Sequence, residues 1–289
     1  MEHFPGIVID EQHSRIYVDE KKFFDDLPDY FEKENSSEYF RISDKYSHVY
    51  RHFVSMDLSG YKAIRGQIIS PISLSLKIVD ENGMPIVYND DMRTLAFSFI
   101  QKKLNVQYSE LKEKNENAFV WIDDPGLEFI FNALCGYDTK KAWNELIDFY
   151  NGINGLHGLH LCGRPDWDFL LSLDIHLLSF NAYAFGDLFV TYEKVKNFIE
   201  KNNIISWGIV PTTNEEFGKE DVEALAKKLE GMWHVLETKG IDREMIVHNS
   251  LLAPATCNLV NVDKTLTVEN SLRLLKQLAE FLKEKYLKN

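Results

Sequence analysis

The sequence has few cysteines and fewer basic than acidic residues, and both features exclude certain classes of protein. Three cysteines, Cys135, Cys162 and Cys257, occur in 289 residues, which is too few for a disulfide scaffold. Lys and Arg total 32 against 45 Asp and Glu, so the formal net charge is -13. This charge repels phosphate backbones and anionic membrane surfaces. We therefore expect neither a nucleic acid nor a membrane as partner.

Long apolar runs and targeting signals are also lacking. The amino-terminal segment MEHFPGIVIDEQHSR has neither a basic start nor a long apolar run. No later segment approaches the roughly 20 apolar residues that crossing a bilayer requires. We therefore expect a cytoplasmic protein.

Apolar, β-rich runs alternate with amphipathic helical runs through most of the chain. Six runs predict strands: IRGQIIS at 64–70, NAFVWID at 117–123, LHGLHLC at 156–162, HLLSFNA at 176–182, IISWGIV at 204–210 and MIVHNSLL at 245–252. Helix-like sequence follows each of them. The alternation predicts a parallel sheet covered by helices, either an open doubly wound sheet or a (β/α)8 barrel.

Reactive side chains favour the barrel over the open sheet. They follow the ends of several predicted strands: Asp123 and Asp124, His160 and Cys162, Asn181, and Cys257. A barrel draws its chemistry from many strand ends around a ring, whereas an open sheet binds its ligand at one switch point. Neither GxGxxG nor GxxxxGK[ST] follows a strand, so a nucleotide-binding fold loses its main support. We predict an α/β fold of the TIM-type (β/α)8 barrel class, as one domain over residues 1–289.

The front of the chain departs from the barrel pattern. Residues 1–60 contain GIVID and RIYVD, two short strands that predict a hairpin, followed by short tyrosine-rich helices. Strand-helix repeats occupy 61–289, and their six confident units fall short of the eight that a full barrel needs. The predicted barrel is therefore shortened or incomplete at its N-terminus.

His160 and Cys162 form a potential chelating pair. Residues i and i+2 of a strand point to the same side, so the two side chains project together from the end of an apolar strand. Cys257 follows the last predicted strand and could lie on the same barrel face. Two thiolates and one imidazole suit zinc better than magnesium or calcium. A buried histidine beside a buried cysteine is the competing interpretation, and we interpret Cys135 as a packing cysteine.

At these residues the sequence resembles the catalytic barrel of cobalamin-independent methionine synthase, whose superfamily also contains corrinoid-dependent methyltransferases and uroporphyrinogen decarboxylase. Six ordered blocks carry the resemblance: GQIISPISL at 66–74, WIDDPGL at 121–127, GLHLCGRPDW at 158–167, LLSFNAY at 177–183, WGIVPT at 207–212 and LLAPATCNL at 251–259. The resemblance implies a zinc-dependent methyltransferase of methionine biosynthesis that activates a homocysteine-like thiol.

The resemblance also implies roles for individual residues. The expected zinc ligands are His160, Cys162 and Cys257. The expected substrate-binding residues are Asp123, Ser70, Asn181 and Trp207. Asp123 would contact the substrate amino group, and Asp123 and Asp124 would both be catalytic. The competing interpretation for Asp123 is a carboxylate that caps the following turn. Trp207 would wall the cavity, although a tryptophan more often lies in the core.

Three departures from the family pattern change these expectations. Asn181 stands where the family has a glutamate zinc ligand, and Asp124 stands where it has the glutamate of IDEP. The family's opening strand, with its Gly-Ser turn, has no counterpart here. The folate-binding half of full methionine synthases is also absent, so we expect methylcobalamin or a corrinoid protein as methyl donor. An oligomer or a partner chain could complete the barrel.

Two alternatives keep the fold and change the function. A non-catalytic barrel that binds a methylated ligand or a partner protein would explain the missing first strands and Asn181. A uroporphyrinogen decarboxylase-like enzyme would need no metal, but it would want an arginine-rich amino-terminal segment. Residues 1–60 contain only Arg15, Arg41 and Arg51 amid many acids.

Overall fold

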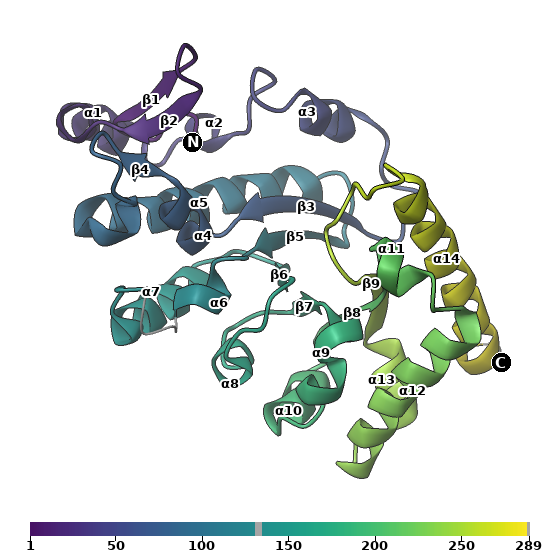
Figure 1. The fold of residues 1–289 in the computed structure, drawn as a ribbon. Coiled ribbons are helices and arrows are strands. Elements are labelled where there is room, and N and C mark those ends of the chain that lie inside the picture. The colour runs from purple at the N-terminus through teal and green to yellow at the C-terminus, as the bar shows by residue number, and fades with distance from the viewer. Residues whose placement is uncertain (131–134, 288–289) are drawn as a thin grey trace. The chain divides into compact units, whose positions relative to one another are not determined.

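The computed structural model describes residues 1–130 and 135–287, in an N-terminal unit, Met1–Gly158, and a C-terminal unit, Leu159–Asn289. Strands alternate with helices within each unit, as the ribbon in Figure 1 shows. The predicted α/β class is therefore confirmed. The prediction of a single domain over residues 1–289 includes residues 131–134 and 288–289, which lie outside the described part.

The N-terminal unit begins with the predicted hairpin. Strand β1 (Ile7–Asp10) pairs antiparallel with β2 (Arg15–Val18), and Ser14 in their turn has a φ of 51°. The two residues of β4 (Val79–Asp80) add to β2 in parallel. Helices α1 (Glu20–Lys33), α2 (Ser37–Phe40) and α3 (His48–Ser55) follow the hairpin. The hairpin lies where the sequence predicts it, whereas α1 has 14 residues and is longer than the short helices predicted there.

A parallel strand pair forms the second part of this unit. Strand β3 (Ile64–Ile69) pairs with β5 (Ala118–Asp123), and the long helix α5 (Asp90–Lys112) packs against both. Gly66 permits this close approach, because a Cβ atom there would lie 2.7 Å from a methyl carbon of Leu111. The remaining helical elements are α4 (Pro71–Lys77), η1 (Ile86–Tyr88), α6 (Leu127–Ile130) and α7 (Thr139–Asn151).

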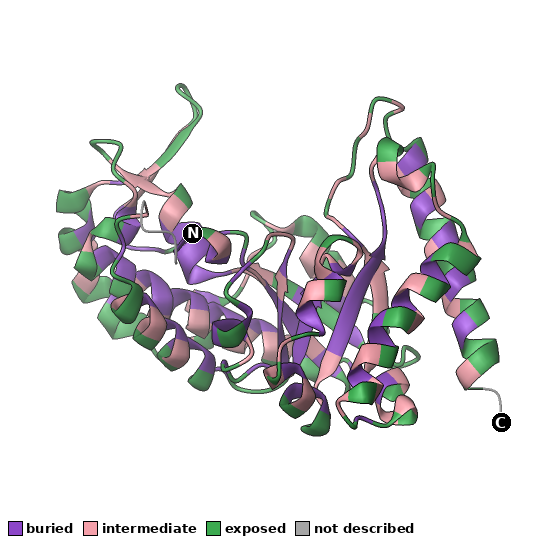
Figure 2. Cartoon of the chain, turned by 60° about the horizontal axis from the view of Figure 1, so that its bottom comes forward, coloured by how far each residue is buried: buried purple, intermediate pink, exposed green. Residues whose placement is uncertain are grey.

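The C-terminal unit contains a parallel run of three strands. Strands β7 (Leu177–Phe180), β8 (Ile204–Val210) and β9 (Ser250–Pro254) pair in this order, and β6 (His157–Leu161) begins just before the unit's first residue. The helices of this unit are α8 (Trp167–Leu170), α9 (Ala182–Phe189), α10 (Lys194–Glu200), α11 (Asn214–Phe217), α12 (Val222–Thr238), α13 (Arg243–His248) and α14 (Leu266–Tyr286). The strands are mostly buried, while the long helices carry buried and exposed residues on opposite sides (Figure 2).

The last predicted strand begins later than the sequence suggested. Residues 243–248 form α13, and only Ser250–Pro254 pair with β8. The Asp242 carboxylate caps this helix by accepting a hydrogen bond from the Glu244 backbone N–H at 2.7 Å. His248 therefore lies on a helix, and its Nδ1 is 2.8 Å from the Glu244 carbonyl oxygen.

The register of β7 and β8 assigns their side chains to two faces. Ser179 pairs with Ser206, and Phe180 pairs with Trp207. Because strand side chains alternate, the two serines share one face and the two aromatic residues share the other. Phe180 and Trp207 both contact Phe189 of α9, with ring centroids 4.5 and 6.1 Å away. The aromatic face is therefore the one that helices cover.

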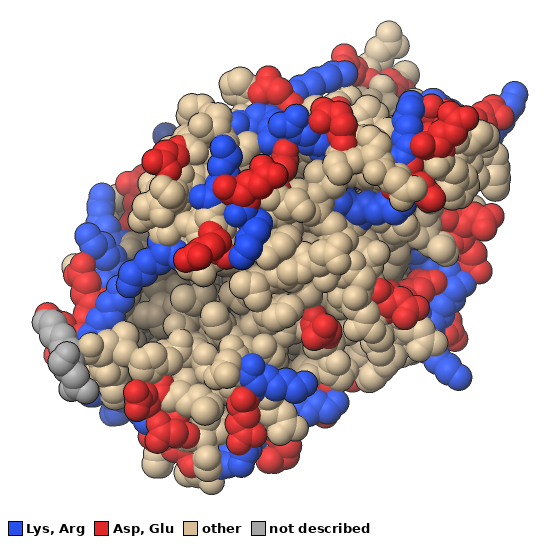
Figure 3. Space-filling model, turned by 180° about the vertical axis from the view of Figure 1, so that it is seen from behind, with Lys and Arg blue, Asp and Glu red and all other residues tan. Residues whose placement is uncertain are grey.

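The described surface mixes charges of both signs. In the face shown in Figure 3, Lys and Arg side chains lie among Asp and Glu side chains. Within residues 1–130 and 135–287, no helix has both the length and the apolarity that a membrane span needs.

Candidate metal centre

His160 and Cys162 project together from the end of β6. His160 is the penultimate residue of the strand, and Cys162 is the first residue after the strand ends. The extended backbone therefore places both side chains on one side. The sulfur of Cys162 lies 3.6 Å from Nε2 of His160. His157 faces the other way, as its spacing predicts, and its ring stacks on Tyr150 of α7 with centroids 6.0 Å apart.

Cys257 reaches the same site from the segment that follows β9. The Ala255 backbone N–H donates a hydrogen bond to the Val210 carbonyl oxygen at 2.8 Å, and the hydroxyls of Thr256 and Thr212 lie 2.6 Å apart. These contacts tie the segment to the end of β8. Cys257 itself is exposed, so the site that it completes is open to solvent.

The three potential ligand atoms lie close enough together to hold one metal ion. Nε2 of His160 lies 3.0 Å from the sulfur of Cys257, and the two sulfurs lie 3.5 Å apart. With Zn–S bonds of 2.3 Å and Zn–N bonds of 2.0–2.1 Å, tetrahedral geometry requires about 3.8 Å between sulfurs and about 3.6 Å from nitrogen to sulfur. The 3.6 Å and 3.5 Å edges of the triangle formed by His160, Cys162 and Cys257 are close to these lengths, and the 3.0 Å edge from His160 to Cys257 is shorter. We call this group the HCC centre.

Electrostatics in the HCC centre favour a thiolate. Hydrogen bonds from Cys257 and from His160 lower the pKa of Cys162 to about 4, although partial burial opposes this shift. The thiolate is the form of cysteine that binds soft metal ions. The sulfur of Cys162 is therefore ready to bind a metal at neutral pH.

Asn181, which follows β7, caps a helix in this structure. Its side-chain oxygen accepts a hydrogen bond from the Ala184 backbone N–H at 3.0 Å and so caps the N-terminus of α9. In the family that the sequence resembles, a glutamate zinc ligand stands at this position. The amide oxygen of Asn181 instead caps the helix, and the His, Cys, Asp and Glu side chains of the described residues supply three potential ligands.

Replacing Asn181 by alanine tests this assignment. We expect Asn181→Ala to lower the free energy of unfolding by about 1 kcal/mol, because the cap is lost. We expect the metal content to stay unchanged, since the amide is not a ligand. Urea unfolding and elemental analysis of the same sample measure the two effects. Loss of the metal together with unchanged stability would contradict the assignment and make Asn181 a ligand.

Trp207 lies in the core and not in the HCC centre. Its side chain is fully buried, and its indole N–H donates to the Ser250 hydroxyl at 2.9 Å. The strand register explains this position, because Ser206 and not Trp207 shares a face with Ser179. The structure gives Trp207 a packing role, and its role in substrate binding stays a prediction.

Asp123 and Ser70 belong to the N-terminal unit. The Gln67 side-chain amide donates to the Asp123 carboxylate, and the Asp123 carbonyl oxygen accepts from the Ser70 backbone N–H at 2.9 Å. The Ser70 hydroxyl is buried and caps α4 by accepting from the Ser73 backbone N–H at 2.9 Å. Ser70 thus has a structural role in the described unit, and the catalytic role of Asp123 stays a prediction.

Asp124 is a fully buried carboxyl group in the same unit. Its Oδ1 accepts a hydrogen bond from the Ser73 hydroxyl at 2.6 Å, and that hydroxyl accepts from the Gly126 backbone N–H at 2.7 Å. Burial raises the pKa of Asp124 to about 6. These contacts fix the turn after β5, and a catalytic role for Asp124 stays a prediction.

The raised pKa of Asp124 predicts a dependence of stability on pH. Between about pH 4 and pH 6 the folded chain keeps the Asp124 proton that the unfolded chain loses, so the free energy of unfolding falls as pH rises. The shift of about two pKa units corresponds to about 3 kcal/mol. We expect Asp124→Asn to remove this part of the decline. Urea unfolding of both proteins from pH 4 to pH 7 measures it, and parallel curves would contradict it.

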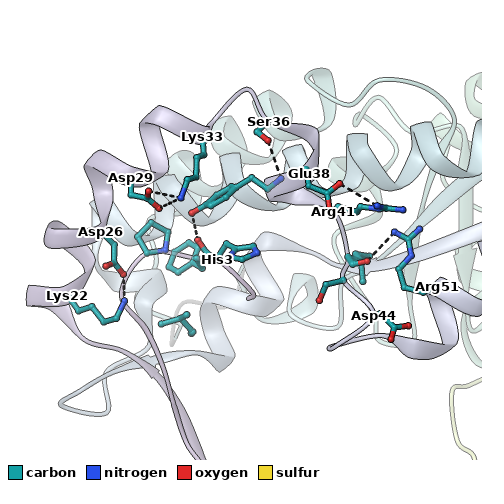
Figure 4. A pocket seen from close by; sticks show the side chains of 16 residues that line it. His3, Lys22, Asp26, Asp29, Lys33, Ser36, Glu38, Arg41, Asp44 and Arg51 are labelled. Carbon is teal, nitrogen blue, oxygen red and sulfur yellow. Dashed lines mark hydrogen bonds and ion pairs between the residues drawn. The ribbon is translucent and has the colours of Figure 1, made fainter.

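A cavity of about 1060 Å³ lies in the N-terminal unit, and its lining includes none of the residues predicted for the site (Figure 4). Lys22 pairs with Asp26, and Lys33 with Asp29 at 2.6 Å. Of the two arginines that line the cavity, Arg41 pairs with Glu38 and Glu110, and Arg51 pairs with Glu110. Each basic side chain labelled in Figure 4 is thus matched by an acid, so this cavity lacks the excess positive charge that binds an anion.

Ser179 is a residue of the centre that the sequence interpretation missed. Its hydroxyl oxygen lies 2.9 Å from Nδ1 of His160, and the residue is buried. The sequence LLSFNA contained a signal for Ser179, because Ser179 and Asn181 are two residues apart and so lie on the same side of the strand.

The predicted packing cysteine, Cys135, belongs to the N-terminal unit, where its carbonyl oxygen accepts a hydrogen bond from the Tyr88 hydroxyl.

A comparison with protein-family models and with curated proteins found no match to this chain. The assignment of a metal centre therefore rests on the spacing and chemistry of the three ligands. Both are properties of the C-terminal unit alone.

Proposed function

We propose that this chain is a zinc-dependent methyltransferase of the methionine synthase type, which methylates a homocysteine-like thiol. The observation that carries the proposal is the HCC centre, whose two sulfurs and one imidazole nitrogen lie within 4.8 Å of one another, close enough to share one metal ion. The sequence resemblance supports the same residues independently of the distances.

The donor set fits zinc and disfavours hard cations. Thiolates and imidazole bind zinc well, whereas magnesium and calcium take oxygen ligands. The lowered pKa of Cys162 supplies one thiolate at neutral pH. His160 supplies the neutral nitrogen from the same strand end. The residues present therefore fit the metal that the resemblance implies.

A thiol substrate is the partner that such a centre serves best. A free thiol has a pKa of about 8.5 and is mostly protonated at pH 7, so it is a poor nucleophile. Bound zinc would hold the substrate sulfur as a thiolate at a fixed position. Asn181, engaged as a helix cap, leaves a ligand position for that sulfur. The exposed side of Cys257 gives substrate and donor access from solvent.

The remaining parts of the proposal come from the sequence. We propose methylcobalamin or a corrinoid protein as methyl donor, and a (β/α)8 barrel as the complete fold, closed by an oligomer or a partner chain where this chain falls short. Asp123 would bind the substrate amino group. We also propose a cytoplasmic location, because a reducing compartment keeps the thiols of such a centre available.

Methyl transfer from methylcobalamin to homocysteine tests the proposal. We expect the zinc-loaded chain to form methionine, and we expect the chelator-treated chain to lose this activity and to regain it when zinc returns. The measurement is methionine formation by mass spectrometry. Tight zinc binding without turnover from methylcobalamin or a methyl-corrinoid protein would favour the non-catalytic alternative.

A further inference from the structure

The two ring nitrogens of His160 have different neighbours. Nε2 faces the sulfurs of Cys257 and Cys162 at 3.0 and 3.6 Å. Nδ1 faces the Ser179 hydroxyl at 2.9 Å. The imidazole is thus held between the ligand triangle on one side and a single hydroxyl on the other.

We propose that Ser179 is a positioning residue of the HCC centre, an inference that rests on the proposed function. A neutral imidazole carries one N–H, and the nitrogen that binds a metal must be the unprotonated one. In a metal-loaded centre the Ser179 hydroxyl would accept the Nδ1–H hydrogen bond, which leaves the Nε2 lone pair for the metal. It also fixes the rotation of the ring about its side-chain bonds.

The strand fixes Ser179 itself in place. Ser179 lies in β7, which pairs with β8 over its whole length, and only 6% of the residue is exposed. A serine on a buried strand has little freedom to move its hydroxyl away from His160. Ligand orientation by such partners contributes about 10- to 100-fold to metal affinity in known sites.

A serine in this role gives the centre a different charge from a carboxylate. Most histidine ligands donate their second N–H to a carboxylate, a backbone carbonyl or a water molecule. The Ser179 hydroxyl is neutral, and the Asn181 amide beyond it is also neutral. With two thiolates and a neutral His160, a divalent zinc site carries no net charge. Binding of one further anionic ligand, such as a substrate thiolate, would bring such a site to a net charge of only -1.

Ser206 provides a matched control. It pairs with Ser179 in the strand register, lies on the same face and is 5% exposed. Changing either serine to alanine removes one buried hydroxyl from neighbouring strands. An effect that is specific to Ser179 therefore cannot come from loss of a buried hydroxyl in general.

The experiment compares the wild-type chain with Ser179→Ala, Ser179→Thr and Ser206→Ala. Zinc affinity is measured by competition with a chromophoric chelator, and the coordination geometry by the visible spectrum of bound Co²⁺. We expect Ser179→Ala to weaken zinc binding about 10- to 100-fold and to change the Co²⁺ spectrum. Ser179→Thr, which keeps a hydroxyl, and Ser206→Ala should bind zinc as the wild type does.

The outcomes separate this inference from the proposed function. Wild-type zinc binding with an equal affinity in Ser179→Ala overturns the positioning role and leaves the metal centre standing. Failure of the wild type to bind zinc overturns both. Should Ser179→Ala not fold, the zinc-loaded wild type decides by nitrogen-15 NMR of His160: a proton on Nδ1 supports the inference, and a proton on Nε2 contradicts it.

Discussion

The purified chain is expected to contain about one zinc ion, and Cys162→Ser or Cys257→Ser is expected to contain almost none. Serine replaces a soft thiolate with a hydroxyl that stays protonated at neutral pH and binds zinc poorly. Removing either sulfur also leaves two protein ligands from the HCC centre. We expect zinc affinity to fall more than about 100-fold, which exceeds the effect of losing an outer partner. Elemental analysis after gel filtration measures the metal per chain.

Cys135→Ser is the matched control for these variants. It removes a thiol of the N-terminal unit that is outside the HCC centre, so zinc content should stay at the wild-type value. Circular dichroism of the three variants separates metal loss from unfolding. Wild-type protein that holds no zinc after reconstitution would rule out the thiol-activation mechanism. The non-catalytic and decarboxylase alternatives would then be preferred.

Most strands of the fold could be predicted because their apolar runs are short and continuous. The runs at 64–70, 117–123, 156–162, 176–182 and 204–210 coincide with β3, β5, β6, β7 and β8. The run at 245–252 was wrong in its first half, because Asp242 caps a short helix there. The two-residue strand β4 depends on its pairing with β2. Such a tertiary contact leaves no periodic signal in the sequence.

In the candidate centre, too, features set by the local sequence could be predicted, and features set by tertiary contacts could not. The i, i+2 spacing predicted that His160 and Cys162 share one side, because side-chain alternation is a property of the strand itself. The position of Trp207 required the register of β7 with β8, which the sequence does not contain. Asn181 did carry a local signal, since asparagine before a helix is a common cap.

The rate of methyl transfer is expected to fall at least about 30-fold at pH 7 in Cys257→Ser, because only about 3% of a free thiol with a pKa near 8.5 is ionised at that pH. The wild-type chain should hold its substrate as a thiolate at this pH and avoid the loss. Positioning of the substrate sulfur would also be lost, so 30-fold is the minimum. Initial rates with methylcobalamin and homocysteine measure the difference.

The pH profile distinguishes thiol activation from a general loss of structure. Residual methyl transfer in Cys257→Ser should rise about tenfold per pH unit until the pKa of the free thiol near 8.5, because each step increases the thiolate in solution. The wild-type rate should change little over the same range, since its substrate is already ionised. Cys135→Ser should follow the wild type. Parallel profiles for Cys257→Ser and the wild type would mean that Cys257 contributes to folding or access, and that the HCC centre does not activate the thiol.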